Sequence, residues 1–278
     1  MFKGFYTATA GMIAQQRRTD LLTNNLANAN TPGFKADQSS LRAFPEMLLQ
    51  RLESKDVPVQ NAFRLPMQQT VGSIHAGVYM QETIPNMAQG DMQQTGRLTD
   101  IALLERAVPV DESGQKGALF FAVEGNNNEL NYTRNGNFTI DAAGFLTTTD
   151  GRYVLSETNE RIQLQGENIR VNEAGTIFEG NTQVARLNVA YANDLSNIVK
   201  RGNGLYQTED GQPLPSAIGN NTIAYDIQQG FLERSSVDTS QTMTEMLTAY
   251  RAFEANQKVM QAYDRSMEKA VSEIGRVR

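Results

Sequence analysis

The sequence predicts an α+β fold in which long N- and C-terminal helices pair as a coiled coil and a β-rich domain lies between them in the chain. Three observations predict it. Apolar residues recur at helical spacing over residues 2–30, a heptad pattern runs over residues 238–274, and short β-prone segments separated by turn signals fill the region between. We divide the chain into an N-terminal helix and turn (1–35), a short helix and connecting loop (36–75), a β-rich central domain (76–235) and a C-terminal helix (236–278).

The N-terminal helix is predicted to end where Asn30 is followed by Thr31, Pro32 and Gly33. Proline disfavours helical geometry in the residue before it, and glycine accepts the left-handed conformation that often closes a helix. The apolar positions that define the helix are Phe2, Phe5, Tyr6, Met12, Ile13, Leu22 and Leu26.

Asparagines crowd the last turns of this helix, at Asn24, Asn25 and Asn28. Asparagine is a mediocre helix former, so something other than helix propensity places these residues there. A frayed helix end and a packing role are both compatible with the pattern.

The region after the first helix is predicted to hold a short helix at about residues 41–53 and a polar loop at about residues 54–75. Strands follow from the short apolar run at residues 120–123 onward, with turn signals between them. Asn135 and Gly136 lie between two β-prone segments, a pattern typical of a hairpin turn.

The C-terminal helix carries the clearest pattern in the sequence. Apolar residues follow alternating steps of three and four, which is typical of a coiled-coil helix. A helix of this length would span roughly 55 Å, more than the core of one compact domain needs. An intramolecular helical hairpin would also explain the pattern. The apolar positions are Met243, Met246, Tyr250, Phe253, Met260, Met267, Val271 and Ile274.

The composition excludes several kinds of chemistry. The chain has no cysteine, and its single histidine, His75, lies among glycines, so we expect no metal site, no cofactor and no histidine-based catalytic triad. The net charge of the chain is −6. Residues 1–35 carry a net charge of +3 and residues 236–278 a net charge of zero, so the residues between them carry a net charge of −9. An acidic middle argues against a nucleic-acid partner. No apolar run is long enough to cross a membrane, and the first residues do not form a secretory signal.

Two rival functions remain compatible with this composition. A glycosidase would need a carboxylic acid in an apolar pocket opposite a second carboxylate, but the acidic residues lie mostly in turns or on the helical face. A surface adhesin could present a β-domain on a coiled-coil stalk. It would not place helices at both ends of the chain with the motifs described next.

Three groups of segments resemble the flagellar axial protein family of rod, hook and hook-associated subunits. They are residues 20–35 near the start; residues 93–102, 120–123, 132–138 and 144–146 in the middle; and residues 230–238, 245–246 and 249–256 near the end. Residues 31–34 followed by residues 41–45 resemble the proximal-rod type more than the distal rod or hook. Residues 103–116 depart from the family pattern, and we expect them to form a lengthened surface loop.

The resemblance implies a structural subunit of the bacterial flagellar basal-body rod that is not an enzyme. Such a subunit would assemble through its terminal helices into the axial tube that transmits torque and surrounds the export channel. Its partners would be other rod and hook subunits, further copies of itself and the flagellar export apparatus. It would lie in the cell envelope outside the cytoplasmic membrane. The residues expected to carry self-assembly are Asn24, Asn25, Leu26, Asn28, Gly33, Phe34, Met243, Met246, Tyr250, Phe253, Met260 and Met267.

Overall fold

The computed structural model describes all of the chain except residues 1, 58–62, 76, 111–113, 115, 126–128, 167 and 275–278. The chain folds into two compact units. The first comprises residues 1–24, 37–84 and 240–278, and the second comprises residues 25–36 and 85–239. Both helices belong to the first unit almost entirely, whereas most of the strands belong to the second.

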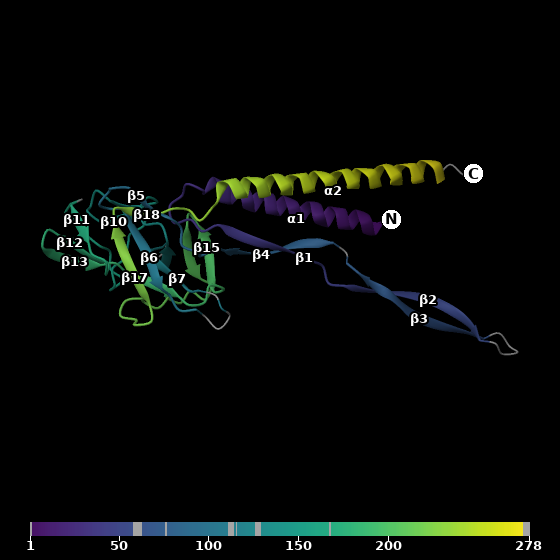
Figure 1. The fold of residues 1–278 in the computed structure, drawn as a ribbon, viewed down its shortest axis with the longest axis horizontal. Coiled ribbons are helices and arrows are strands. Elements are labelled where there is room, and N and C mark those ends of the chain that lie inside the picture. The colour runs from purple at the N-terminus through teal and green to yellow at the C-terminus, as the bar shows by residue number, and fades with distance from the viewer. Residues whose placement is uncertain are drawn as a thin grey trace. The chain divides into compact units, whose positions relative to one another are not determined.

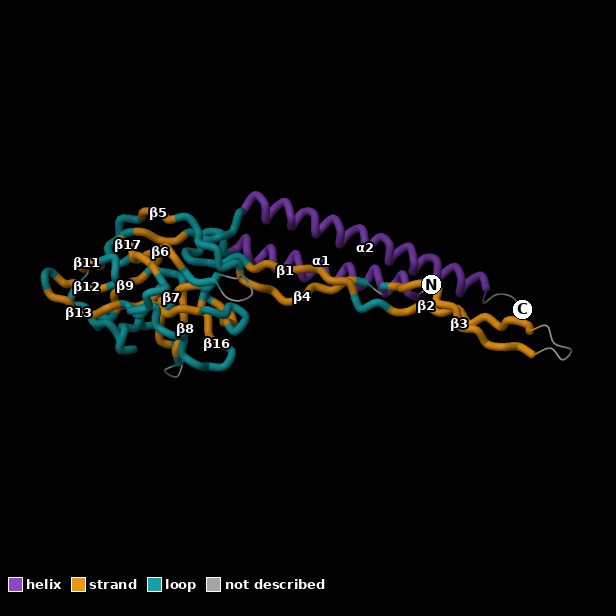
Figure 2. Tube along the Cα trace, turned by 60° about the horizontal axis from the view of Figure 1, so that its bottom comes forward, coloured by secondary structure: helices purple, strands orange, loops and turns teal. Residues whose placement is uncertain are grey.

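Two long helices lie side by side in the first unit, α1 (Phe2–Ala27) and α2 (Thr239–Ile274) (Figures 1 and 2). They run antiparallel, because the start of α1 contacts the far part of α2 and the end of α1 contacts its start. The Thr9 hydroxyl donates to Met260 Sδ at 3.7 Å, and Arg18 Nη2 lies 3.3 Å from Glu245 Oε2. The two helices predicted from periodicity are therefore confirmed, although α1 ends three residues earlier than expected.

The rest of the first unit is β-structure. β1 (Asp37–Ala43) pairs with β4 (Val78–Pro85), and β2 (Met47–Val57) pairs antiparallel with β3 (Phe63–Ile74). The prediction of a short helix at residues 41–53 is wrong, and so is the prediction of a loop over the described part of residues 54–75. Pairing between strands overrides local spacing, and the partner of β1 lies far along the chain.

The second unit contains several antiparallel sheets around one strand that is buried on both sides. The largest sheet has the order β14-β7-β8-β16-β15, and β11, β12 and β13 form a three-stranded sheet. Three two-stranded sheets pair β5 with β18, β6 with β17 and β9 with β10. The bounds of these strands are β5 Met92–Gln94, β6 Ile101–Ala107, β7 Ala118–Glu124, β8 Leu130–Thr133, β9 Phe138–Ile140, β10 Leu146–Thr148, β11 Ile169–Val171, β12 Thr176–Glu179, β13 Thr182–Arg186, β14 Val189–Ala192, β15 Ile198–Gly202, β16 Leu205–Thr208, β17 Ala224–Gln229 and β18 Phe231–Glu233.

The core of the second unit is built on both faces of β7. Phe121 belongs to one apolar cluster with Phe138 and Leu146, and Phe120 belongs to a second cluster with Tyr206. A strand covered on both faces reads as a continuous apolar run, which is how residues 118–123 appear in the sequence.

Two further predictions about the middle of the chain are wrong. Asn135 and Gly136 do not close a hairpin, because β8 pairs with β7 and β16 while β9 pairs with β10. A side chain at Gly136 would overlap the carbonyl of Ile101, so this glycine permits a close approach to the start of β6. The expected surface loop at residues 103–116 begins instead as most of β6, which pairs with β17 and buries Leu103. The expected tip of that loop, at residues 111–113, lies outside the described residues.

Candidate functional site

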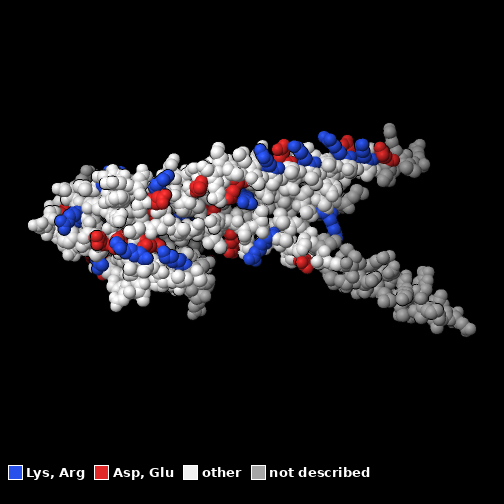
Figure 3. Space-filling view, viewed as in Figure 1, with Lys and Arg blue, Asp and Glu red and all other residues white. Residues whose placement is uncertain are grey.

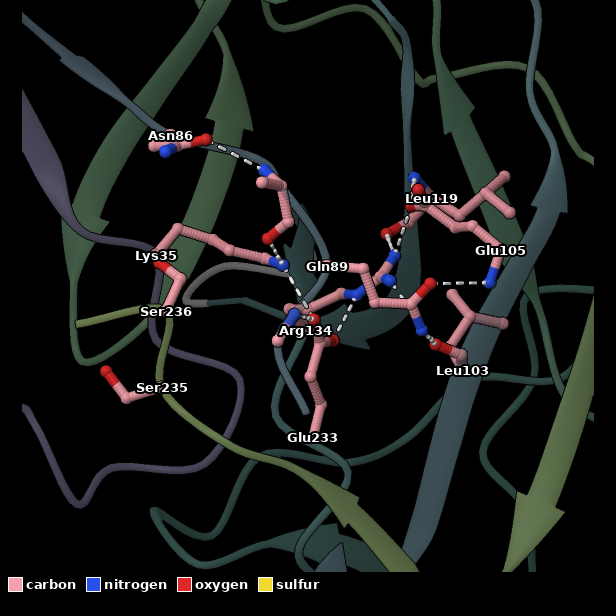
Figure 4. A network of polar contacts seen from close by, with 12 residues as sticks. Lys35, Asn86, Gln89, Leu103, Glu105, Leu119, Arg134, Glu233, Ser235 and Ser236 are labelled. Carbon is pink, nitrogen blue, oxygen red and sulfur yellow. Dashed lines mark hydrogen bonds and ion pairs between the residues drawn. The ribbon is translucent and has the colours of Figure 1, made fainter. Parts of the chain in front are cut away.

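Four charged side chains from separate segments meet inside the second unit and form an ion cluster (Lys35, Glu105, Arg134 and Glu233; Figure 4). Lys35 follows the turn after α1, Glu105 lies in β6, Arg134 follows β8, and Glu233 ends β18. Each of the four side chains is at most 3% exposed. The cluster therefore connects the segment that follows α1 and the segment that precedes α2 to the sheets of the second unit.

Arg134 is the centre of the ion cluster. Its Nε donates to Glu233 Oε2 at 2.6 Å, and its Nη1 donates to Glu105 Oε1 at 2.7 Å. The same guanidinium also donates to a backbone carbonyl of β7 at 2.6 Å and to one of β6 at 3.3 Å. The other oxygen of Glu233 accepts from Lys35 Nζ at 2.7 Å and from the backbone amide of Gly90 at 2.8 Å. These bonds satisfy both carboxylate oxygens of Glu233.

The formal charges of the four side chains cancel, and their pKa values follow from burial and from one another. Burial would raise the pKa of Glu233, but Arg134 and Lys35 together hold it below its ordinary value. Burial would lower the pKa of Arg134, but Glu233 and Glu105 raise it above its ordinary value. Burial and repulsion from Arg134 lower the pKa of Lys35 despite the attraction of Glu233. Buried charges persist only with such partners, so the cluster holds segments together.

Gly33 and Phe34 seat the turn after α1 beside the ion cluster. Gly33 has a φ of +67°, and a Cβ at this position would lie 2.5 Å from the backbone carbonyl of Arg134. Its amide donates to the carbonyl of Glu233 at 2.8 Å. Phe34 is 4% exposed, and Lys200 Nζ lies 3.9 Å from the centre of its ring. Glycine is therefore required here both for the left-handed backbone and for the close approach.

One face of α2 is covered, and its residues form the inner stripe. They recur at steps of three and four, and all are buried or half-buried. Contacts with α1 arise along it, because side chains at Gly4 and Gly11 would overlap Tyr263 and come within 3 Å of Asn256, respectively. These two glycines of α1 therefore permit the approach. The members of the inner stripe are Met246, Ala249, Phe253, Asn256, Met260, Tyr263, Met267 and Ala270.

The apolar heptad predicted for α2 divides between two faces. Met246, Phe253, Met260 and Met267 belong to the inner stripe, whereas Met243 and Tyr250 are 54% and 59% exposed. Val271 is 75% exposed, and the side chain of Ile274 lies outside the described residues. Leu247, which the heptad did not include, is 53% exposed between Met243 and Tyr250. The predicted residues thus do not form a single contact surface.

The predicted residues at the end of α1 also differ in exposure. Asn24 is exposed, Leu26 and Asn28 are half-buried, and Asn25 is only 4% exposed. The Asn28 side chain accepts a hydrogen bond from the Thr31 hydroxyl at 3.2 Å, which ties it to the turn that follows. Of the three asparagines, Asn24 is the one whose side chain faces solvent.

The sequence did not identify the ion cluster as a site. Lys35, Arg134 and Glu233 each lie in one of the three groups of segments that resemble the flagellar axial proteins, and Glu105 lies in the segment read as a loop. A charged residue next to apolar residues, as at Phe34-Lys35 and Leu232-Glu233, was the available signal. This local signal does not indicate which charged side chains lie close together in the fold.

The remaining candidates for chemistry are few. His75 is exposed and lies 3.3 Å from Glu46 Oε1. Within the described residues, no three acidic, histidine or cysteine side chains are grouped to hold a metal ion. No helix in the described part of the chain is both long and apolar enough to cross a membrane.

Paired terminal helices and a β-rich unit whose charged centre gathers segments from both ends define an axial structural subunit. Comparison with protein-family models agrees with this class. The model for the flagella basal body rod protein matches residues 5–35, that for the flagellar hook protein FlgE/F/G D1 domain matches residues 116–179, and that for the flagellar basal body rod FlgEFG protein C-terminal region matches residues 228–273. Lys35, Arg134 and Glu233 fall one in each match.

Curated relatives match along the whole chain. The flagellar hook-basal body complex protein FlhO of Bacillus subtilis is 48% identical over 278 residues, which is 100% of both chains. The flagellar basal-body rod protein FlgF of Caulobacter vibrioides is 28% identical over 100% of both chains. The flagellar basal-body rod protein FlgG of Borreliella burgdorferi is 29% identical over 95% of this chain and 96% of its own.

The chain belongs to the flagellar basal-body rod protein family. It is a structural rod-type subunit of the flagellar basal body, in a family whose members associate with other rod and hook subunits.

Proposed function

We propose that this subunit assembles through its terminal helices. In this proposal α1 and α2 pair as an antiparallel coiled coil, and the outward faces of the pair contact neighbouring subunits. The resulting axial tube transmits torque and surrounds the export channel, and the chain reaches it through the flagellar export apparatus. The subunit has no catalytic activity in this scheme.

One observation carries the proposal. Met243, Leu247 and Tyr250 follow one another at steps of four and three on α2, and each is more than half exposed. Neighbouring apolar side chains of this size left in water mark a surface that another molecule covers. The inner stripe of α2 already serves α1, so these three side chains are available to a neighbour.

The predicted assembly residues then divide by role. Met246, Phe253, Met260 and Met267 hold α2 against α1. Met243 and Tyr250 contact the neighbour directly, and so does Asn24. Asn25, Leu26, Asn28, Gly33 and Phe34 fix the end of α1 and the turn that follows it.

The substitution Leu247→Lys tests the proposal. Because Leu247 is exposed, we expect the variant chain to fold, with unchanged circular dichroism, and to be lost from isolated basal bodies with loss of swimming. Val184→Lys is the matched control, since Val184 is an apolar residue of β13 that is 38% exposed. Normal swimming and normal incorporation of Leu247→Lys would contradict the proposal. Equal losses of the two variants would show that the effect is not specific to the exposed apolar residues of α2.

A further inference from the structure

Two further stripes run along α2 outside the inner stripe, and both are exposed over their whole length. The acidic stripe consists of Met243, Leu247, Tyr250, Glu254, Gln257, Gln261, Asp264, Glu268 and Val271. The basic stripe consists of Thr244, Thr248, Arg251, Ala255, Lys258, Ala262, Arg265, Lys269 and Ser272. Lysine, arginine and acidic side chains gather along this helix in Figure 3.

Charge is sorted between the two stripes. The acidic stripe carries three carboxylates and no basic residue, whereas the basic stripe carries four basic residues and no carboxylate. Each member of the basic stripe follows a member of the acidic stripe in the sequence, so the stripes are about 100° apart around the helix. Each stripe keeps the alternating steps of four and three that let a helix contact a neighbouring helix along its length.

We propose that the acidic stripe of one copy of this chain docks on the basic stripe of α2 in the next copy, with the two helices parallel. The inference rests on the proposed assembly through the terminal helices and specifies which faces meet. Because the two stripes are different surfaces of one helix, the contact is head-to-tail, and a head-to-tail contact produces a ring or a helical filament instead of a closed pair.

Charge complementarity identifies the occupant as a second copy. Arg251, Lys258 and Arg265 recur every seven residues, and Glu254 and Glu268 repeat at twice that interval, so parallel helices bring opposite charges together along their length. Small residues in the basic stripe leave room for the larger apolar side chains of the acidic one. Complementary charge also suppresses wrong partners and wrong registers, since like charges brought together are strongly unfavourable.

One ion pair within the chain joins the two stripes. Lys258 Nζ lies 3.0 Å from Glu254 Oε1 one turn away, and these side chains are 72% and 49% exposed. An exposed pair of this kind contributes little, so it can be exchanged for a contact with a neighbour.

Three full-length variants test the proposal. The first reverses the acidic stripe (Glu254, Asp264 and Glu268→Lys), and the second reverses the basic stripe (Arg251, Lys258, Arg265 and Lys269→Glu). The third carries all seven substitutions and so exchanges the two charges. The measurement is the amount of the chain in isolated basal bodies by immunoblot, together with swimming, and circular dichroism of the purified chains controls for folding.

We expect the first two variants to be lost from basal bodies and the third to be restored towards the wild-type amount. The third is the decisive variant, because it conserves the contact between copies whatever their axial offset, and it also conserves the local pairing of residues 254 and 258. Wild-type incorporation of either single-stripe variant would overturn the proposal. Loss of the exchanged variant would also overturn it, since a different protein would then occupy the stripes. Absence of the wild-type chain from basal bodies would instead refute the proposed function.

Discussion

Removing the central arginine of the ion cluster should destabilise the second unit severely. Arg134→Met retains an unbranched side chain but leaves two carboxylates opposite Lys35, a net charge of −1 in a site where Arg134 itself is 1% exposed. Breaking a buried ion pair by deleting one partner costs about 3–5 kcal/mol, because the remaining charge is desolvated and unpaired. For a unit of this size that corresponds to a fall in melting temperature of about 6–20 °C.

Urea denaturation followed by circular dichroism measures this loss, and Arg161→Met is its matched control. Arg161 also makes two short hydrogen bonds to one carboxylate, Glu124, at 2.6 and 2.7 Å. Its side chain is 45% exposed, so we expect a cost of about 0–1 kcal/mol. An equal loss of unfolding free energy in Arg134→Met and Arg161→Met would refute the reasoning, because a buried arginine would then contribute no more to stability than an exposed one.

A second substitution separates charge from packing. Arg134→Met combined with Glu105→Gln returns the cluster to neutrality, with Lys35 still paired with Glu233. We therefore expect the double variant to lose less stability than the sum of its two single variants, by about 0.5–3 kcal/mol. Strict additivity would mean that the cost of Arg134→Met comes from lost packing and hydrogen bonds to the backbone.

Three further predictions follow from the same region. The pKa of Glu233 is held below its ordinary value in the folded chain, so its stabilising contribution is present above pH 4.5 and is lost as the pH falls below that value. Glu233→Gln should therefore reduce the fall in the free energy of unfolding that is measured between pH 5 and pH 3. Gly33→Ala should destabilise the chain more than Gly96→Ala, because both have a positive φ but only Gly33 approaches other backbone, and urea midpoints measure the difference. Asn25→Ala should lower stability by about 1–3 kcal/mol, whereas the exposed Asn24→Ala should leave it unchanged and reduce incorporation into basal bodies.

Periodicity predicted the helices well because their spacing is a local property of the sequence. It failed to give the correct face of α2, since the inner stripe contains Ala249, Asn256 and Ala270. A search for large apolar residues passes over these positions and selects Met243 and Tyr250 instead. The close approach of the two helices instead depends on Gly4 and Gly11 of α1, which leave room for Tyr263 and Asn256.

Two predictions in the middle of the chain failed where the pairing of strands is not local. Residues 103–116 were predicted to form a surface loop because they depart from the family pattern, yet residues 103–107 belong to β6, which pairs with β17. Residues 135–136 carry a strong local turn signal, but the strands on either side belong to different sheets. Local turn chemistry fixes where the chain bends, whereas strand partners are fixed by the packing of the whole unit.

The ion cluster joins one residue from each of the three segments that the family models match. Lys35 lies at the end of the first match, Arg134 within the second and Glu233 within the third. Without any one of these residues the remaining charges no longer cancel in a site from which water is excluded. Through these charges the segment after α1 and the segment before α2 are bound to each other and to the strands of the second unit.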